Sequence, residues 1–87
     1  MPYIKQENRN QFNSLMKELN NTKINSPGEL NYLFTMVLQQ YMVDRPISYQ
    51  TFNDILGALE GAKLELYRSL VSKYEDLKKD EHGDVYK

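Results

Sequence analysis

The chain has 87 residues, with 11 Lys and Arg against 12 Asp and Glu, no cysteine and one histidine. Its net charge of −1 argues against a protein that coats nucleic acid, because such proteins usually carry a strong basic excess. Without cysteine there are no disulfides or thiolate metal sites, and His82 alone cannot build a zinc site. We therefore expect no metal, no cofactor and no DNA or RNA polymer as partner.

The first predicted helix covers residues 7–21. Its apolar residues are spaced as one face of a helix with 3.6 residues per turn, with polar residues between them. These residues are Phe12, Leu15, Met16 and Leu19. The run Asn20-Asn21-Thr22 then weakens the helix and ends it.

The second predicted helix covers residues 27–43 and has the clearest start signal in the chain. Ser26 stands at the N-cap, Pro27 at the first helical position and Glu29 at the third, which together make a capping box. Its apolar residues keep helical spacing throughout: Leu30, Leu33, Phe34, Val37, Leu38 and Tyr41. Pro46 stops the helix, because a residue that precedes proline is pushed out of the helical conformation.

The third predicted helix covers residues 49–77, and Ser48 is its expected cap. Its apolar stripe runs over about 43 Å at 1.5 Å per residue: Phe52, Ile55, Leu56, Leu59, Ala62, Leu66, Leu70, Tyr74 and Leu77. The second helix covers little more than half of that length. We therefore expect a single all-α domain, a three-helix protomer with a long C-terminal helix, that assembles into a helical homo-oligomer.

Residues 78–87 are predicted to form a charged tail, which is usually disordered. Val85 and Tyr86 follow a glycine, however, and such a pair can dock in a groove. No apolar run approaches the ~20 residues of a membrane span, and the N-terminus has no signal-peptide pattern. We expect a soluble cytoplasmic protein without a membrane partner.

Two small pairs one turn apart, Gly57 with Gly61 and Ala58 with Ala62, interrupt the third helix. A glycine inside a helix costs about 1 kcal/mol relative to alanine, so the pair needs a reason. The small residues either let a helix of another chain approach closely or make room for the second helix of the same protomer. Both interpretations remain open.

A second stripe on the third helix carries Lys63, Tyr67 and Arg68. A cation beside a stackable aromatic ring suits a nucleotide, because the ring covers a base and the cation meets a phosphate. The alternative is a pair of ordinary surface ion pairs, Glu60 with Lys63 and Glu65 with Arg68, and the spacing favours it.

Four further residues are candidates for ligand binding. Asn31 and Tyr32 lie in the first turn of the second helix, where free backbone N–H groups favour anions. Tyr3 and Tyr86 lie near the chain ends, and tyrosine suits both interfaces and ligand pockets. Catalytic motifs are missing: there is no G-x-S-x-G elbow, phosphate-binding loop or H-E-x-x-H. We therefore expect a binding protein and no enzyme.

Four motifs in the same order resemble a widespread family of short, long-uncharacterised phage and bacterial proteins. They are Met1-Pro2-Tyr3-Ile4 with Gln6-Glu7, then Ser26–Tyr32, then Gly57–Arg68, and finally Glu75-Asp76 with Gly83–Tyr86. The family is in turn similar to phage anti-CBASS sponges. That similarity implies a small helical tetramer that binds cyclic dinucleotides such as cyclic GMP-AMP and keeps them from host effectors. A homo-oligomeric protein–protein adaptor, or a purely structural oligomer, is the alternative.

Overall fold

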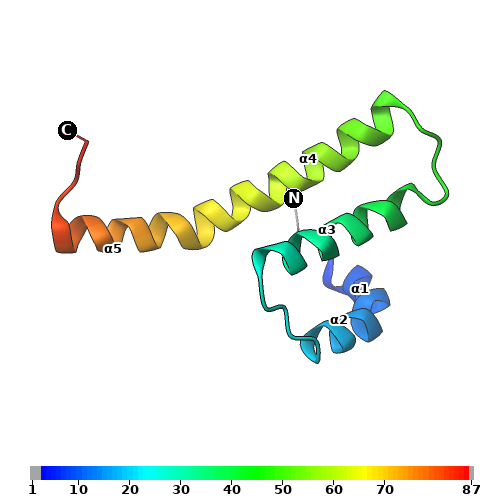
Figure 1. Cartoon of the computed structure of the whole chain (residues 1–87), viewed down its shortest axis with the longest axis horizontal. Coiled ribbons are helices and arrows are strands. Elements are labelled where there is room, and N and C mark those ends of the chain that lie inside the picture. Colours follow the sequence, from blue (N-terminus) through cyan, green and yellow to red (C-terminus); the bar gives the residue numbers. More distant parts are fainter. Residues whose placement is uncertain (1–2, 87) are drawn as a thin grey trace. The chain divides into compact units, whose positions relative to one another are not determined.

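The computed structural model describes residues 3–86, and every regular element in that range is helical (Figure 1). The all-α class is therefore confirmed. The helices, in chain order, are α1 (Gln6–Arg9), the 3-10 helix η1 (Asn10–Phe12), α2 (Asn13–Asn20), α3 (Pro27–Met42), α4 (Tyr49–Leu66), the π-helical turn η2 (Tyr67–Val71) and α5 (Ser72–His82).

The described chain divides into two units, residues 3–55 and residues 56–86, and the boundary falls within α4. Each unit is described by itself below. The single domain expected from the length of the chain stays a prediction. No helix in residues 3–86 combines the length and the apolar character that a membrane crossing requires.

The first predicted helix, 7–21, is present as three short helices, α1, η1 and α2, that end one residue earlier than expected. Phe12, with φ −99° and ψ 5°, departs from helical geometry where α2 begins. Side chains hold the turns before it: Gln11 donates to the carbonyl of Asn8 at 3.0 Å, and Arg9 donates to that of Ile4 at 3.0 Å.

The start of α3 follows the predicted capping arrangement. Ser26 is extended, and its hydroxyl accepts the backbone N–H of Glu29 at 3.2 Å, with Pro27 at the first helical position. At the other end, the guanidinium of Arg45 lies 3.7 Å from the centre of the Tyr41 ring and also donates to the Tyr41 carbonyl. The helix ends at Met42, one residue before the predicted end.

Ser48 caps α4 as predicted. Its hydroxyl accepts the backbone N–H of Thr51 at 3.3 Å, and the Thr51 hydroxyl donates to the carbonyl of Pro46 at 3.0 Å. One turn further along, Ile55 is only 8% exposed and Thr51 only 7%. The two buried residues of the described chain, residues 3–86, therefore both lie in the first turns of α4.

The predicted end of the third helix at residue 77 is wrong, since the helix continues through η2 and α5 to His82. The charged residues after Leu77 support the helix: Lys78 and Glu81 pair at 3.3 Å with the i, i+3 spacing that helices favour. Gly83 follows the last helical residue and has φ +83°, a conformation that suits glycine. Its N–H donates to the Lys79 carbonyl at 2.7 Å and so completes the end of the helix. The tail within the described residues is therefore 83–86.

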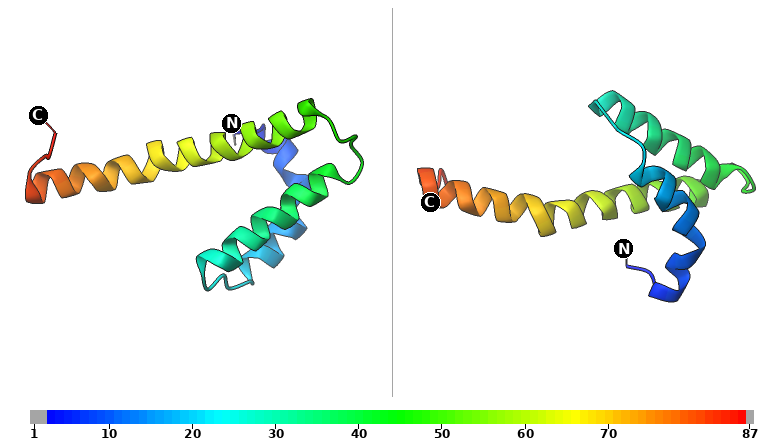
Figure 2. Two further views of the ribbon diagram at one scale, coloured as in Figure 1. Left: turned by 45° about the horizontal axis from the view of Figure 1, so that its top comes forward. Right: turned by 90° about the horizontal axis from the view of Figure 1, so that it is seen from below.

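From Leu56 to His82 the backbone runs as one continuous rod in both views of Figure 2. Residues 56–86 contain no second helix or strand that could pack against this rod within the unit. Five of its large apolar side chains are more than half exposed: Leu64, Leu66, Leu70, Tyr74 and Leu77. An amphipathic helix gains most of its stability by packing its apolar face, and residues 56–86 alone leave that face uncovered.

Candidate functional site

The π-helical turn η2 changes which side chains share a face of the long helix. A π turn holds one residue more than an α turn, and each residue of an α-helix turns by about 100°. Two residues eight apart across η2 are therefore placed like residues seven apart in an uninterrupted helix, about 20° from each other around the axis. Tyr67 and Glu75 are such a pair.

Tyr67 and Glu75 are hydrogen-bonded. The Tyr67 hydroxyl donates to the two carboxylate oxygens of Glu75, at 3.1 Å to Oε2 and 3.3 Å to Oε1. This hydrogen bond, followed by the negative charge of Glu75, raises the pKa of Tyr67 above its ordinary value of 10.0, while the charge of Lys79 acts in the opposite direction. Glu75 therefore holds the phenol in its protonated form.

The raised pKa of Tyr67 predicts a contribution to stability that disappears at alkaline pH. A proton held more tightly in the folded state stabilises the fold below the ordinary pKa of 10.0, and this contribution is lost as the pH rises through the raised pKa. We expect Glu75→Gln to lower the pKa of Tyr67. Ultraviolet titration of tyrosinate checks this, with Tyr67→Phe identifying the signal. An unchanged Tyr67 titration in Glu75→Gln would contradict the assignment.

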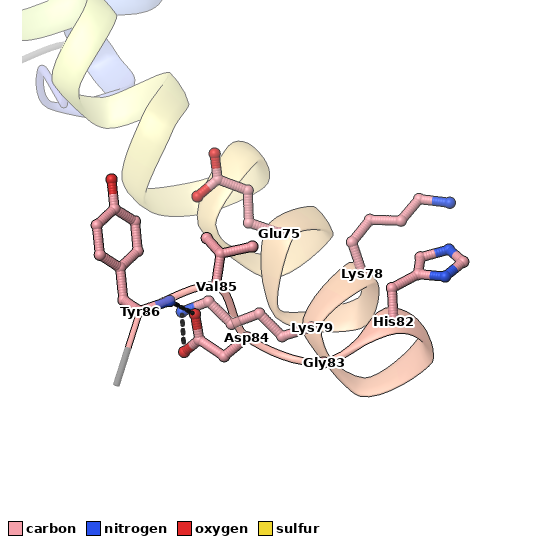
Figure 3. Close-up of a pocket in the computed structure, with 8 residues that line it drawn as sticks. All are labelled: Glu75, Lys78, Lys79, His82, Gly83, Asp84, Val85 and Tyr86. Carbon is pink, nitrogen blue, oxygen red and sulfur yellow. Dashed lines mark hydrogen bonds and ion pairs between the residues drawn. The ribbon is translucent and has the colours of Figure 1, made fainter.

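The four residues after α5 lie against the end of that helix (Figure 3). Lys79 Nζ lies 3.7 Å from Asp84 Oδ2, and the backbone N–H of Tyr86 donates to Asp84 Oδ1 at 2.9 Å. Gly83 makes the turn that lets the chain come back. Val85 and Tyr86 remain 88% and 84% exposed, so docking of this pair in a groove stays a prediction.

A cavity of about 360 Å³ lies between α5 and the returning tail, within residues 56–86. Figure 3 shows Tyr86 and Val85 alongside Glu75, with Lys78 and His82 farther along α5. Glu75 thus belongs to both features, since it accepts the Tyr67 hydroxyl and also lines the cavity. The hydrogen-bond partner of Tyr67 therefore lines the same cavity as Tyr86.

Lys63 and Arg68, the two predicted cations, both have carboxylate partners on the same helix. Lys63 Nζ lies 3.8 Å from Glu60 Oε1, and Arg68 donates to Glu65, which also accepts the Ser69 hydroxyl at 2.9 Å. The surface pairs of the alternative interpretation are therefore present. Both cationic side chains are more than two thirds exposed and can be reached by an anion. The exposed Lys63–Glu60 pair contributes at most about 1 kcal/mol, whereas the Glu65 side chain that holds Arg68 is only 16% exposed.

The other predicted site residues lie in the unit of residues 3–55. Tyr32 is exposed and lines a cavity of about 140 Å³ with Lys23, Ile24 and Glu29. Asn31 accepts the Thr35 hydroxyl on its backbone carbonyl at 2.9 Å, and Tyr3 is exposed. These three residues are therefore accessible, and their part in binding stays a prediction.

Glu75 belongs to one of the sequence motifs, but the sequence did not identify it as a residue of the site. In a regular helix Tyr67 and Glu75 would be about 80° apart, and nothing would connect them. The spacing of the apolar residues Leu66, Leu70 and Tyr74, each four residues after the last, could have indicated the π turn. In a regular α-helix, residues four apart are rotated by about 40° around the axis, so such a row leaves its face unless a wider turn compensates for the rotation.

The fold and the site define a small all-helical protein whose tyrosine–carboxylate site lies on one long helix and its returning tail. Among residues 3–86, no three His, Asp or Glu side chains are grouped so that they could hold a metal ion. The chain belongs to the family described as a domain of unknown function, DUF6899, which matches residues 1–85. No curated protein and no solved structure matches it. Because the family description names no activity, the similarity to anti-CBASS sponges stays a prediction.

Proposed function

We propose that the protein is a phage immune-evasion sponge, a homo-oligomeric module that binds a cyclic dinucleotide of bacterial CBASS defence and holds it intact. The observation that supports this most is the open cavity lined by Glu75, Lys78, Lys79 and Tyr86, with the Tyr67 hydroxyl hydrogen-bonded to Glu75. Aromatic rings stack on bases, and lysines neutralise phosphates. The chain offers both kinds of group within residues 56–86.

In this proposal the two tyrosines Tyr67 and Tyr86 stack on the bases. Lys63 and Arg68 neutralise phosphates, since both side chains are exposed on the turns before and within η2. Tyr3, Asn31 and Tyr32, in the unit of residues 3–55, are further candidates for ligand contact, and Asn31 suits a base edge or a phosphate oxygen.

The proposed oligomer, a tetramer, is built on the long helix. Its support is the apolar face of residues 56–82, which no other element of that unit covers. An added Cβ at Gly57 would meet no heavy atom within 4 Å, so there is open space for another backbone beside this glycine. In this arrangement the ligand pockets lie between protomers.

Native mass spectrometry of the full chain with a panel of cyclic di- and trinucleotides tests this function directly. We expect a complex with cyclic GMP-AMP or a related cyclic dinucleotide at micromolar concentration or below. Heat denaturation should then release the nucleotide with its mass unchanged. Absence of binding across the panel would remove the proposal, and recovery of a broken nucleotide would indicate an enzyme.

Alanine substitutions separate the ligand site from the assembly. The double variant Lys63→Ala with Arg68→Ala should lose nucleotide binding and keep the oligomer, because both cationic side chains are more than two thirds exposed. Lys73→Ala, which removes one charge from α5 away from the proposed contacts, is the control. Loss of the oligomer in the double variant would favour a purely structural role for this stripe.

A protein–protein adaptor is the second candidate, and the exposed segment between α3 and α4 favours it. Val43, Ile47 and Tyr49 are all largely exposed there, which suits contact with another polypeptide. Recovery of one stoichiometric protein partner in a pull-down, together with no bound nucleotide, would favour the adaptor over the sponge.

A further inference from the structure

Glu75 has no cationic partner in the described chain. No Lys, Arg or His nitrogen of residues 3–86 lies within 4.0 Å of its carboxylate, and within that range its hydrogen-bond partner is the Tyr67 hydroxyl. An ionised carboxylate has about four acceptor positions on its two oxygens and donates nothing. Beside the cavity, Glu75 is therefore an acceptor with unused capacity.

Resting on the proposed function, we propose that Glu75 binds the Watson–Crick edge of a guanine, which makes the site selective for guanine-containing cyclic dinucleotides. Guanine presents two adjacent donors on that edge, N1–H and N2–H, and they match the two oxygens of one carboxylate. Adenine presents a donor beside an acceptor, and that acceptor would face a carboxylate oxygen. A carboxylate therefore distinguishes the two purines by charge and by hydrogen-bond pattern.

The Tyr67 hydroxyl occupies the place that the guanine edge would take. It donates to both oxygens of Glu75, at 3.1 and 3.3 Å, which is longer than the 2.5–3.0 Å usual for an O–H···O bond. A guanine edge would instead donate two N–H hydrogen bonds, one to each oxygen of the ionised carboxylate. Together these two charge-assisted hydrogen bonds are stronger than the one O–H that the two oxygens now share. The base therefore displaces the hydroxyl and leaves the Tyr67 ring free to stack.

The surroundings of Glu75 suit a nucleotide. The cavity of about 360 Å³ lies at the lower end of the range of ligand pockets, which is large enough for a base. Tyr86, 84% exposed, offers an uncovered ring alongside Glu75 (Figure 3). Lys78 and Lys79 line the same cavity as Glu75 and Asp84, and Lys79 pairs with Asp84 at 3.7 Å. The lining therefore offers ammonium groups for a phosphate beside the carboxylate that would accept the base edge.

Calorimetric titration of the full chain with cyclic di-GMP, cyclic GMP-AMP and cyclic di-AMP tests the inference. We expect cyclic di-GMP to bind at least about tenfold more tightly than cyclic di-AMP, as for a good bidentate base contact. Glutamine carries one acceptor and one donor, the pattern that matches adenine, so Glu75→Gln should reduce this ratio by about tenfold or more. Tyr67→Phe keeps the ring and removes the competing hydroxyl, and should tighten cyclic di-GMP binding a few-fold.

Asp76→Asn is the matched control, because it removes the same charge from the adjacent position of α5, about 100° around the helix. It should leave the ratio between the two nucleotides unchanged. Circular dichroism of both variants shows that the helix is retained. Equal binding of cyclic di-GMP and cyclic di-AMP by the unmodified protein would overturn the guanine inference and leave the proposed function standing. Failure of every cyclic dinucleotide to bind would overturn both.

Discussion

Leu70→Asp is expected to convert the proposed homo-oligomer into monomers. Leu70 is 63% exposed in the middle of the long helix, and Leu66 and Tyr74 lie four residues before and after it. Because η2 widens the helix between them, these three side chains stay close to one face. If a second copy covers this face, an aspartate at its centre becomes a buried charge without a partner.

The energies indicate why a single substitution can decide the assembly. Fully burying one leucine-sized side chain contributes roughly 1.5–3 kcal/mol, so four such residues on each of two copies contribute at most roughly 12–24 kcal/mol. Association costs about 4–15 kcal/mol, which leaves a modest surplus. An unpaired buried carboxylate costs several kcal/mol and also removes the contribution of Leu70, which is enough to cancel that surplus.

Light scattering coupled to size-exclusion chromatography, over a range of protein concentrations, measures this effect. Ser72→Asp is the matched control: it adds the same charge two residues along, about 200° around the helix from Leu70, and serine and aspartate have similar helix propensities. We expect the control to remain assembled. A wild-type mass equal to one chain at every concentration would show that the apolar face has another partner.

The start signals of the helices could be predicted from the sequence because they depend on neighbouring residues. Ser26 with Glu29, and Ser48 before α4, act through hydrogen bonds that span three positions, and both caps are present. The end of the long helix could not be predicted in the same way. The charged residues from Lys78 onwards have the composition of a tail, and only their i, i+3 pairing and the stop at Gly83 show that they continue the helix.

The site was harder to predict than the fold because it depends on one wide turn. Tyr67 was predicted to be a site residue because the regular spacing of a helix places Lys63 and Arg68 close to it. Its actual hydrogen-bond partner, Glu75, is eight residues away and reaches it only across η2. A prediction that assumes 3.6 residues per turn throughout assigns Glu75 to a different face, so the error follows directly from the geometry.

Ile55→Ala is expected to cause the largest loss of stability of any single truncation to alanine in the chain. Ile55 is the large apolar residue that is buried within residues 3–86, at 8% exposure. Truncation of a buried isoleucine to alanine costs about 2–5 kcal/mol, from lost burial and from the cavity left behind. The higher helix propensity of alanine returns only a few tenths of a kcal/mol at this position in α4.

Ile47→Ala is the matched control, since it removes the same atoms from a residue that is 87% exposed in the segment before α4. Urea unfolding at a fixed protein concentration should show a clear drop in midpoint for Ile55→Ala, and a change within about 0.5 kcal/mol for Ile47→Ala. A protein of this length has a total stability of only about 4–13 kcal/mol, so the loss at Ile55 removes a large share of it. Equal midpoints for the two variants would mean that the fold gains its stability from the surface that assembly covers, and that Ile55 contributes little by itself.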